Sequence, residues 1–226
     1  MVLSSIAIPI PAPIAMTLVL YPDRMNLRDL KDRFLAIPWV YDSLRPLVAG
    51  GIDLKSLARF CALESADRVF DLGCGTAQLL RFLSCEKYLG ADLDSQAVER
   101  ALRYASESVR FMQGDQWDNA YRDLHPTVVL MIGVVHHVSD AGFASIIGRL
   151  RGADPPPGRV VTIDVTYFPE QTLNNLLSRM DRGRFVREPQ GYDRLYAEQG
   201  LRIVKREILP TRLRYVSYLG YHLSFT

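Results

Sequence analysis

The stretch VFDLGCGTAQLLRFL, from Val69 to Leu83, decides the fold class. Its first residues are typical of a buried strand, its glycines of a tight turn, and its last residues of a helix. Glycine lets the backbone of such a turn approach a ligand closely, because it carries no side chain. A strand, a glycine turn and a helix in this order indicate a site for a nucleotide-like ligand.

The chain after this turn alternates between short apolar runs and longer amphipathic segments. Near-continuous apolar runs predict strands buried on both faces, as in a parallel sheet covered by helices. The expected strands are residues 68–73, 88–93, 109–115, 127–133 and 159–166, and the expected helices are residues 77–85, 95–107, a short helix around Tyr121, and 141–152. This order predicts an α/β, Rossmann-like, doubly wound fold.

The C-terminal end departs from the ordinary dinucleotide-binding plan. Residues 201–209 and 212–225 are both typical of strands, and only Pro210 and Thr211 separate them. So short a link requires an antiparallel hairpin, because parallel strands need a long crossover. The sequence therefore predicts a mostly parallel, seven-stranded sheet that ends in a C-terminal antiparallel hairpin.

The composition is that of an ordinary globular protein. The chain has 226 residues, 48% of them hydrophobic, and a net charge of +2. So small a charge gives no sign of nucleic-acid binding. The three cysteines have no metal-ligand spacing, so we expect no metal site, and a reducing compartment is the simplest interpretation. We expect a cytoplasmic protein, and the sequence leaves its oligomeric state open.

The first 24 residues are apolar but contain Pro9, Pro11 and Pro13. Prolines break helices, so we expect no membrane span, and no basic residue precedes the apolar part as it does in a signal peptide. We expect residues 1–24 to form a flexible tail. Residues 25–226 are expected to form a single domain that begins with a helical cap.

The glycine turn departs from the dinucleotide fingerprint G-x-G-x-x-G at one position. Gly73 and Gly75 are present, but Gln78 replaces the third glycine, which normally allows close packing of helix and strand. Asp71, just before the turn, is a poor neighbour for a pyrophosphate, since both are negatively charged. It suits an ammonium or sulfonium group instead. These residues argue against a nicotinamide dinucleotide.

Two further carboxylates end the next two expected strands. Asp92 follows the turn by about 20 residues, where an acid can accept hydrogen bonds from ribose hydroxyls, and Asp115 ends the third strand. The carboxyl ends of parallel strands meet at one edge of the sheet, so we expect these acids and Asp71 to face one crevice. Their natural complement is an amino acid, a ribose and an adenine, without phosphate.

Four segments in this order, FDLGCGTA, LGADLD, GDQWD and VVLMIGVVHHVSD, resemble the successive motifs of the class I S-adenosylmethionine-dependent methyltransferases. The resemblance extends from Asp67 to Phe225 and includes the final hairpin. It implies a methyltransferase domain with S-adenosyl-L-methionine as its cofactor. Ala77 stands where the family often has a third glycine, and Val128 stands where it often has an acid.

The resemblance implies contacts to the methionine and ribose parts of the cofactor. Gly73 and Gly75 would face the methionine part. Asp71 would hold its amino group, directly or through water. Asp92 would bind the ribose hydroxyls.

The resemblance also implies contacts to the adenine. Leu93 would lie against the ring, and Asp115 would accept the hydrogen bond of the adenine amino group. Gln116 would lie beside the ring. Ile132 falls where the family often has a polar residue, so its contact would come from its backbone carbonyl.

Methyl transfer to a hydroxyl requires a base, and two histidines are candidates. His136 and His137 follow the fourth expected strand, and since adjacent residues point in different directions, one of them is expected to face the site. Tyr167 and Arg184 are candidate substrate residues in the segment after the fifth strand. Residues 181–189, DRGRFVREP, are expected to form a mobile lid, in which Gly183 gives the backbone freedom and at least one arginine meets an anionic or polyhydroxylated acceptor.

The segment MIGVVHH, residues 131–137, stands where methyltransferases that modify nucleic-acid bases carry an Asn-Pro-Pro-Tyr type tetrapeptide. We therefore expect a small-molecule acceptor, methylated at oxygen rather than at nitrogen or carbon, and neither a nucleic acid nor a membrane as partner. Two alternatives stay open at this point. One is a nicotinamide-dependent oxidoreductase, and the other is a non-catalytic S-adenosylmethionine-binding protein.

Overall fold

The computed structural model describes residues 53–180, 183–211 and 216–226. These residues belong to one compact unit, Asp42–Thr226. The expected tail at residues 1–24, the part of the expected cap before residue 53, and Arg182 lie outside the described residues. Among the helices that the structure describes, none combines the length and the apolar character that a membrane crossing requires.

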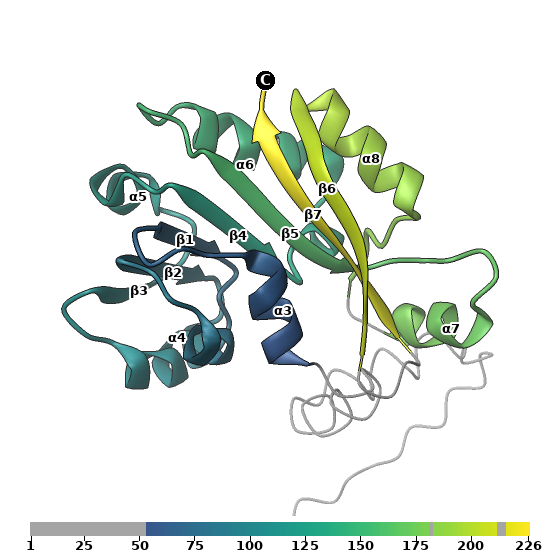
Figure 1. Cartoon of the computed structure of the whole chain (residues 1–226), viewed down its shortest axis with the longest axis horizontal. Helices are drawn as coiled ribbons and strands as arrows, with labels where there is room; N and C mark the ends of the chain where they lie inside the picture. The colour runs from purple at the N-terminus through teal and green to yellow at the C-terminus, as the bar shows by residue number, and fades with distance from the viewer. Residues whose placement is uncertain (1–52, 181–182, 212–215) are drawn as a thin grey trace, which may run out of the picture. The chain divides into compact units, whose positions relative to one another are not determined.

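Seven strands form one mixed sheet in the order β3-β2-β1-β4-β5-β7-β6 (Figure 1). The strands are β1 (Arg68–Leu72), β2 (Lys87–Asp92), β3 (Val109–Gln113), β4 (Val128–Ile132), β5 (Arg159–Val165), β6 (Leu201–Pro210) and β7 (Ser217–Phe225). The first five are parallel, and β7 lies antiparallel between β5 and β6. The predicted fold class, with its terminal antiparallel hairpin, is confirmed.

Helices cover both faces of the sheet. They are α3 (Leu54–Cys61), α4 (Ser95–Ala101), α5 (Asp118–Leu124), α6 (Asp140–Arg151), α7 (Thr172–Met180) and α8 (Pro189–Glu198). Side-chain caps fix where some of them begin: Asp53 accepts from backbone amides of α3, Asp94 from those of α4, and Ser139 from that of Gly142 in α6.

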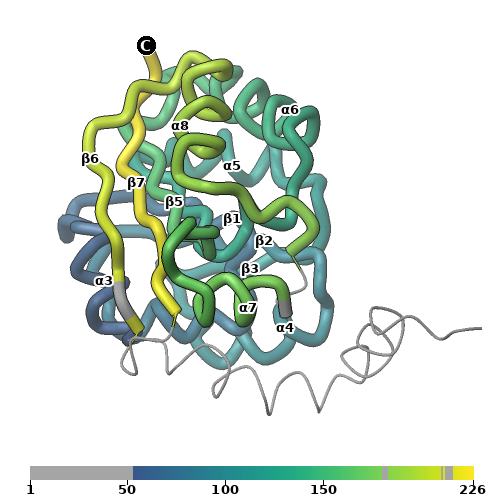
Figure 2. Tube along the Cα trace, turned by 90° about the vertical axis from the view of Figure 1, so that its right-hand side faces the viewer, coloured from purple at the N-terminus to yellow at the C-terminus, as the bar shows by residue number. Residues whose placement is uncertain are grey.

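Neighbouring residues of β1 belong to two different cores, because successive side chains of a strand point to opposite faces. Phe70 packs in the core that α5, α6 and α8 cover, and Val69 packs in the core that α3 covers. Figure 2 allows the two sides to be followed, with α3 on one side of β6 and β7 and α8 on the other. Both faces are therefore buried, as the apolar runs predicted.

Three local predictions differ from the structure. Residues 77–85 were expected to be helical, but only a short 3-10 helix, Gln78–Phe82, forms there. Of the expected helix 95–107, α4 and a 3-10 turn at Leu102–Tyr104 are present. The hairpin link is longer than two residues, since β6 ends at Pro210 and β7 begins at Ser217, with the Thr211 amide donating to the Val216 carbonyl at 3.1 Å. Residues 212–215 lie outside the described part.

Candidate active site

The glycine turn follows β1 directly and is fixed to β2. Gly73 and Gly75 have φ angles of 77° and 53°, a region that glycine enters without strain. The amides of Gly73 and Cys74 both donate to the Ala91 carbonyl, at 2.7 and 3.1 Å. A Cβ at Gly73 would overlap the Val134 side chain, whereas a Cβ at Gly75 would meet no atom within 4 Å. Gly73 is thus required by packing, and Gly75 leaves its backbone open to a ligand.

Ala77 continues the turn in a left-handed conformation, with a φ of 53°. A non-glycine residue adopts this conformation at some cost, which explains why a glycine is common at this place in the proteins that the motif resembles. The methyl group of Ala77 is buried at 2% exposure, so it packs inward and leaves the ligand side of the turn unobstructed.

Asp92 joins the second strand to the glycine turn. Its Oδ2 accepts from the Gly75 amide at 2.7 Å, and its Oδ1 accepts from the Asp94 amide at 2.9 Å. Each carboxylate oxygen has two acceptor positions, so both retain capacity for hydroxyl donors. Leu93, the next residue, is 73% exposed and presents an apolar surface at the same edge.

Asp115 and Gln116 lie in the turn after β3, and both side chains are exposed. The Gln116 amide group donates to Asp115 Oδ1 at 3.2 Å. Because β3 is parallel to β2, this turn lies at the edge of the sheet where Asp92 ends β2. The sequence placed both residues at this edge, and their contact to adenine stays a prediction.

Asp71 is the most unusual carboxylate at this edge, because it is buried. Its Oδ2 accepts a hydrogen bond from the Tyr88 hydroxyl at 2.6 Å, and its Oδ1 has no hydrogen-bond partner in the described part of the chain. Burial raises the pKa of the Asp71 carboxyl to about 6, the Tyr88 hydrogen bond opposes this rise, and the Asp92 charge adds to it. A buried carboxylate with one oxygen unsatisfied suits a cationic group such as an α-ammonium.

The residues after β4 complete this edge. Ile132 is partly buried, and Gly133 follows with a φ of 72° while its amide donates to the Ile163 carbonyl at 2.7 Å. Since β4 is parallel to β1, the end of β4 lies next to the glycine turn. Ile132 is therefore at the edge where the sequence placed it, and its role stays a prediction.

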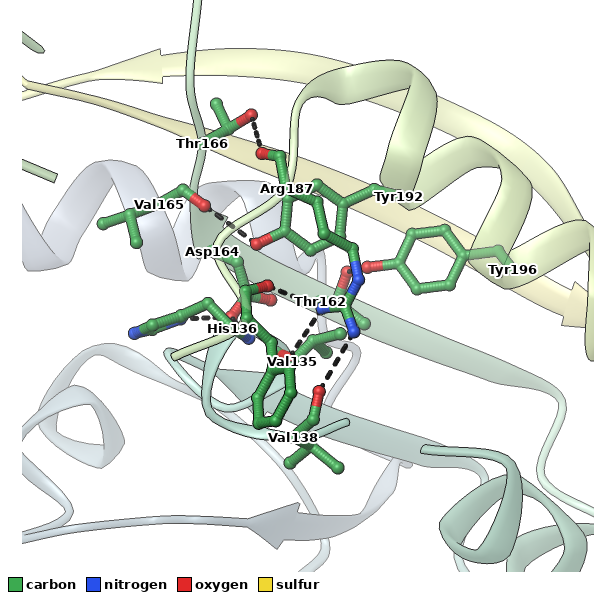
Figure 3. Close-up of polar contacts among 11 residues, drawn as sticks. Val135, His136, Val138, Thr162, Asp164, Val165, Thr166, Arg187, Tyr192 and Tyr196 are labelled. Carbon is green, nitrogen blue, oxygen red and sulfur yellow. Dashed lines mark hydrogen bonds and ion pairs between the residues drawn. The ribbon is translucent and has the colours of Figure 1, made fainter. Parts of the chain in front are cut away.

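The two candidate histidines differ sharply in exposure. His136 is 3% exposed, and its Nδ1 forms a hydrogen bond of 2.7 Å with Asp164 Oδ1, which also accepts from the His136 backbone amide at 3.2 Å (Figure 3). The His137 ring is exposed, and its centre lies 4.1 Å from that of His136. Asp164 therefore fixes the backbone and the ring of His136, while His137 remains accessible.

Residues 183–187 pack on the turn that carries these histidines. The Phe185 amide donates to the His136 carbonyl at 2.9 Å. A Cβ at Gly183 would overlap the His136 ring, so only glycine allows this approach. The sequence interpretation gave Gly183 a role in backbone freedom, whereas the structure shows a role in close packing.

Arg187 ties the same segment down, which the sequence did not predict. Its guanidinium donates to the backbone carbonyls of Val135 and Val138, each at 3.1 Å (Figure 3). It also forms an ion pair with Asp140. Its own carbonyl accepts from the Thr166 hydroxyl at 2.8 Å. With its side chain 13% exposed and engaged in these bonds, Arg187 holds the segment and is not a candidate for acceptor binding.

The other candidate acceptor residues, Tyr167 and Arg184, both precede Arg187 in the chain. Tyr167 is partly buried, and its amide donates to the Arg187 carbonyl at 3.3 Å. Phe168 is 9% exposed and packs inward. The side chain of Arg184 is exposed and makes no hydrogen bond or ion pair with the residues described. Arg184 therefore remains the candidate for an acceptor contact.

Two residues of the site were missed by sequence reasoning. Asp164 interrupts the apolar run RVVTIDV, and a carboxylate in a strand buried on both faces requires a partner, so a signal was present. Tyr88 was read only as a strand residue. Its hydroxyl is the hydrogen-bond donor that satisfies one oxygen of Asp71, and no sequence spacing indicates such a pair.

Comparisons with known proteins agree with the fold. Residues 69–158 match a family model described as a methyltransferase domain. No curated protein sequence matches the chain. A methyltransferase of calicheamicin biosynthesis, solved with S-adenosylhomocysteine bound, has a similar fold, with a TM-score of 0.62 and 16% identity over 87% of this chain and 61% of that one.

Two further solved structures share the fold but differ in acceptor. Mitomycin 7-O-methyltransferase has a TM-score of 0.59 and 17% identity, over 87% of this chain and 60% of that one. A candidate tRNA methyltransferase from Streptococcus pneumoniae has a TM-score of 0.53 and 11% identity, over 75% of this chain and 68% of that one. The shared fold is therefore compatible with more than one class of acceptor.

Proposed function

We propose that this class I S-adenosylmethionine-dependent methyltransferase transfers the methyl group to a hydroxyl oxygen of a small organic molecule. The proposal rests on one observation. Two segments of the chain, residues 166–168 and 183–187, form a wall that packs on the turn after β4. Its contacts include those from the Phe185 amide to His136 and from Arg187 to Val135 and Val138. We infer that a segment packed at this edge of the sheet favours a small acceptor over a macromolecular one.

The cofactor residues are proposed from the hydrogen-bonding groups that they leave available to a ligand. The orphan Oδ1 of Asp71 suits the α-ammonium group of the amino-acid part, and the open backbone at Gly75 suits its close approach. Asp92 retains acceptor capacity for the ribose hydroxyls. The exposed Asp115 carboxylate is proposed to accept the hydrogen bond of the adenine amino group. When bound, S-adenosylmethionine supplies a methyl group that is already activated by its sulfonium, so the protein has mainly to orient the acceptor.

His137 is the better candidate for the base that accepts the hydroxyl proton. A general base has to come within hydrogen-bond reach of the proton that it removes, and the His137 ring is exposed whereas that of His136 is buried. His136, bound to Asp164, would then support the turn that carries His137. A carboxylate on Nδ1 is the usual way to fix the ring and the tautomer of a histidine.

The compartment and the class of acceptor follow from the chain's chemistry. Cys61, Cys74 and Cys85 are all free thiols, which supports a reducing, cytoplasmic environment. The Asn-Pro-Pro-Tyr type tetrapeptide is replaced by residues 131–137, which supports an acceptor other than a nucleic-acid base. We propose that the natural acceptor is a soluble metabolite that carries a hydroxyl group.

The test is transfer of an isotopically labelled methyl group. The purified full chain is incubated with methyl-labelled S-adenosylmethionine and, in separate reactions, a fractionated small-molecule extract, total tRNA and a protein extract. Label is expected in a small molecule, bound to oxygen in its fragmentation spectrum, and the His137→Gln variant is expected to transfer it more slowly. Label confined to tRNA or to protein would contradict the small-molecule proposal, and label on nitrogen or carbon would correct the acceptor atom.

A further inference from the structure

Arg149 of α6 holds the turn after β3 with a single guanidinium group. Its Nη2 donates to the backbone carbonyl of Asp115 at 2.6 Å. Its Nε and Nη2 donate to the two carboxylate oxygens of Asp118, at 2.9 and 2.6 Å. The pair with Asp118 is bidentate, the arrangement in which an arginine fork gives both strength and a fixed geometry. One side chain therefore fixes both ends of the turn 115–118.

Trp117, inside the same turn, links this group to the core. The guanidinium carbon of Arg149 lies 3.7 Å from the centre of a Trp117 ring, which is a close cation–π contact. Trp117 is 1% exposed and packs against Phe70 and Tyr121, with ring centres 5.1 and 5.4 Å apart. The turn is thus held from outside by Arg149 and from inside by an aromatic cluster.

The two side chains that the turn presents at the cofactor edge make few contacts of their own. Asp115 and Gln116 are exposed, and the Gln116 side-chain amide donates to Asp115 Oδ1 at 3.2 Å. Their direction depends on the backbone, because the Asp115 carbonyl that Arg149 binds belongs to the peptide group between Asp115 and Gln116. Loss of Arg149 would leave this peptide group free to rotate.

We propose that Arg149 is a positioning residue for the adenine of the cofactor, because it holds the turn 115–118 in the conformation that directs Asp115 and Gln116 at the base. The inference rests on the proposed contact between Asp115 and the adenine amino group. Affinity is gained in this way through preorganisation, since the turn pays no ordering cost when the ligand arrives. Lysine cannot replace Arg149, because an ammonium group lacks the planar fork that binds Asp118 and the Asp115 carbonyl together.

The experiment compares two ligands that differ only at the base. Calorimetry measures the dissociation constants of S-adenosylhomocysteine and S-inosylhomocysteine, in which a carbonyl replaces the adenine amino group. The dissociation constant of S-inosylhomocysteine divided by that of S-adenosylhomocysteine reports how strongly the protein recognises the amino group. A loss of stability alone, spread over the domain, leaves this ratio unchanged, whereas a displaced Asp115 lowers it.

The variants are Arg149→Ala, Arg149→Lys and Asp115→Ala, with Arg151→Ala as the matched control. Arg151 lies in the same helix and also donates to a backbone carbonyl, that of Gln199 at 2.6 Å, at a place remote in sequence from the turn 115–118. Removing Asp115 is expected to lower the ratio about tenfold, the effect of one hydrogen bond to a charged acceptor. Both Arg149 variants are expected to lower it at least threefold, and Arg151→Ala to preserve it.

Three results would overturn the inference. In the first, Asp115→Ala lowers the ratio but Arg149→Ala leaves it as in the parent. This would show that the turn keeps its shape without the arginine. An equal loss in Arg151→Ala would show a general effect of α6. An unchanged ratio in Asp115→Ala would show that Asp115 does not read the adenine, and it would remove that cofactor contact from the proposed function while leaving methyl transfer itself untouched.

Discussion

The ends of β1 to β3 and the ends of β4 and β5 both carry buried or half-buried carboxylates, but these are satisfied in different ways. Asp71 and Asp92 find partners within 17 residues of the chain, and one oxygen of Asp71 has no partner among the described residues. Asp164 binds His136, 28 residues away, through both the ring and the backbone amide of that residue, although its own Oδ2 also has no partner among the described residues. Arg187 reaches back 52 residues to Val135. The first region has polar capacity left for a ligand, whereas the second uses much of its capacity to hold the protein together.

This difference predicts different losses when one group is removed. In the first region a substitution should weaken ligand binding more than folding, since the group serves the ligand. In the second region a substitution should weaken folding first, since the group serves the chain.

The largest effect is expected from His136→Ala, in the second region. The change leaves the buried Asp164 carboxylate without its imidazole partner, and breaking a buried pair in this way costs about 3–5 kcal/mol. Denaturant unfolding should show this loss in the free energy of unfolding. A double variant, His136→Ala with Asp164→Ala, should lose less than the sum of the two single variants, because neither polar partner is then left buried alone. A single-variant loss below about 1 kcal/mol would contradict the contrast.

Asp92→Ala should affect the first region, and here the loss should appear in binding. A hydrogen bond to a charged acceptor contributes about 1.5–3 kcal/mol, so the affinity for S-adenosylhomocysteine should fall by about ten- to a hundredfold. Calorimetry measures the affinity, and thermal unfolding checks the fold. Asp94→Ala is the matched control, because Asp94 caps α4 and its loss should cost about 1 kcal/mol of stability without a change in affinity. An unchanged affinity in Asp92→Ala would remove the ribose contact.

The contrast between local partners in the first region and distant partners in the second also explains how much of the molecule was predictable from sequence. The succession of strands and helices along the chain follows from local patterns, and so do the glycine turn and the acids at Asp71, Asp92 and Asp115, because each of these acids lies at or near the end of an apolar run. The role of Arg187 was not predictable, because its partners Val135 and Val138 are backbone carbonyls, which leave no mark on side-chain identity. The helix expected at 77–85 is only a 3-10 helix at Gln78–Phe82, which follows the left-handed Ala77, and helix propensity gives no sign of such a backbone conformation.

The pH dependence of cofactor binding tests the orphan oxygen of Asp71. Burial raises the pKa of its carboxyl to about 6, so at pH 5 the group is mostly protonated and attracts an ammonium group weakly. A bound ammonium favours the ionised carboxylate, so binding should release a proton. The affinity for S-adenosylhomocysteine should therefore rise about tenfold from pH 5 to pH 7 and then level off.

Asp71→Asn is the control for this prediction, since it keeps the shape of the side chain and removes its titration. Its affinity should be lower at pH 7 and nearly constant between pH 5 and pH 7. Calorimetry in two buffers of different ionisation enthalpy counts the released protons directly. If the parent protein binds equally well at both pH values, the ammonium group does not lie against Asp71.

The smallest effect is expected for Arg184→Ala, which tests whether the second region has a hydrogen-bond donor available to the acceptor. Arg184 is exposed and makes no hydrogen bond or ion pair within the described part of the chain, so its loss should cost little stability. If its guanidinium meets an anionic or hydroxylated acceptor, the KM for the acceptor found by labelled transfer should rise about three- to tenfold, with kcat unchanged. Arg187→Ala is the matched comparison, because the same residue type three positions later is bound to Val135, Val138 and Asp140 and should lose stability instead. Equal KM values in the parent and in Arg184→Ala would place acceptor recognition elsewhere and leave Arg184 as a surface charge.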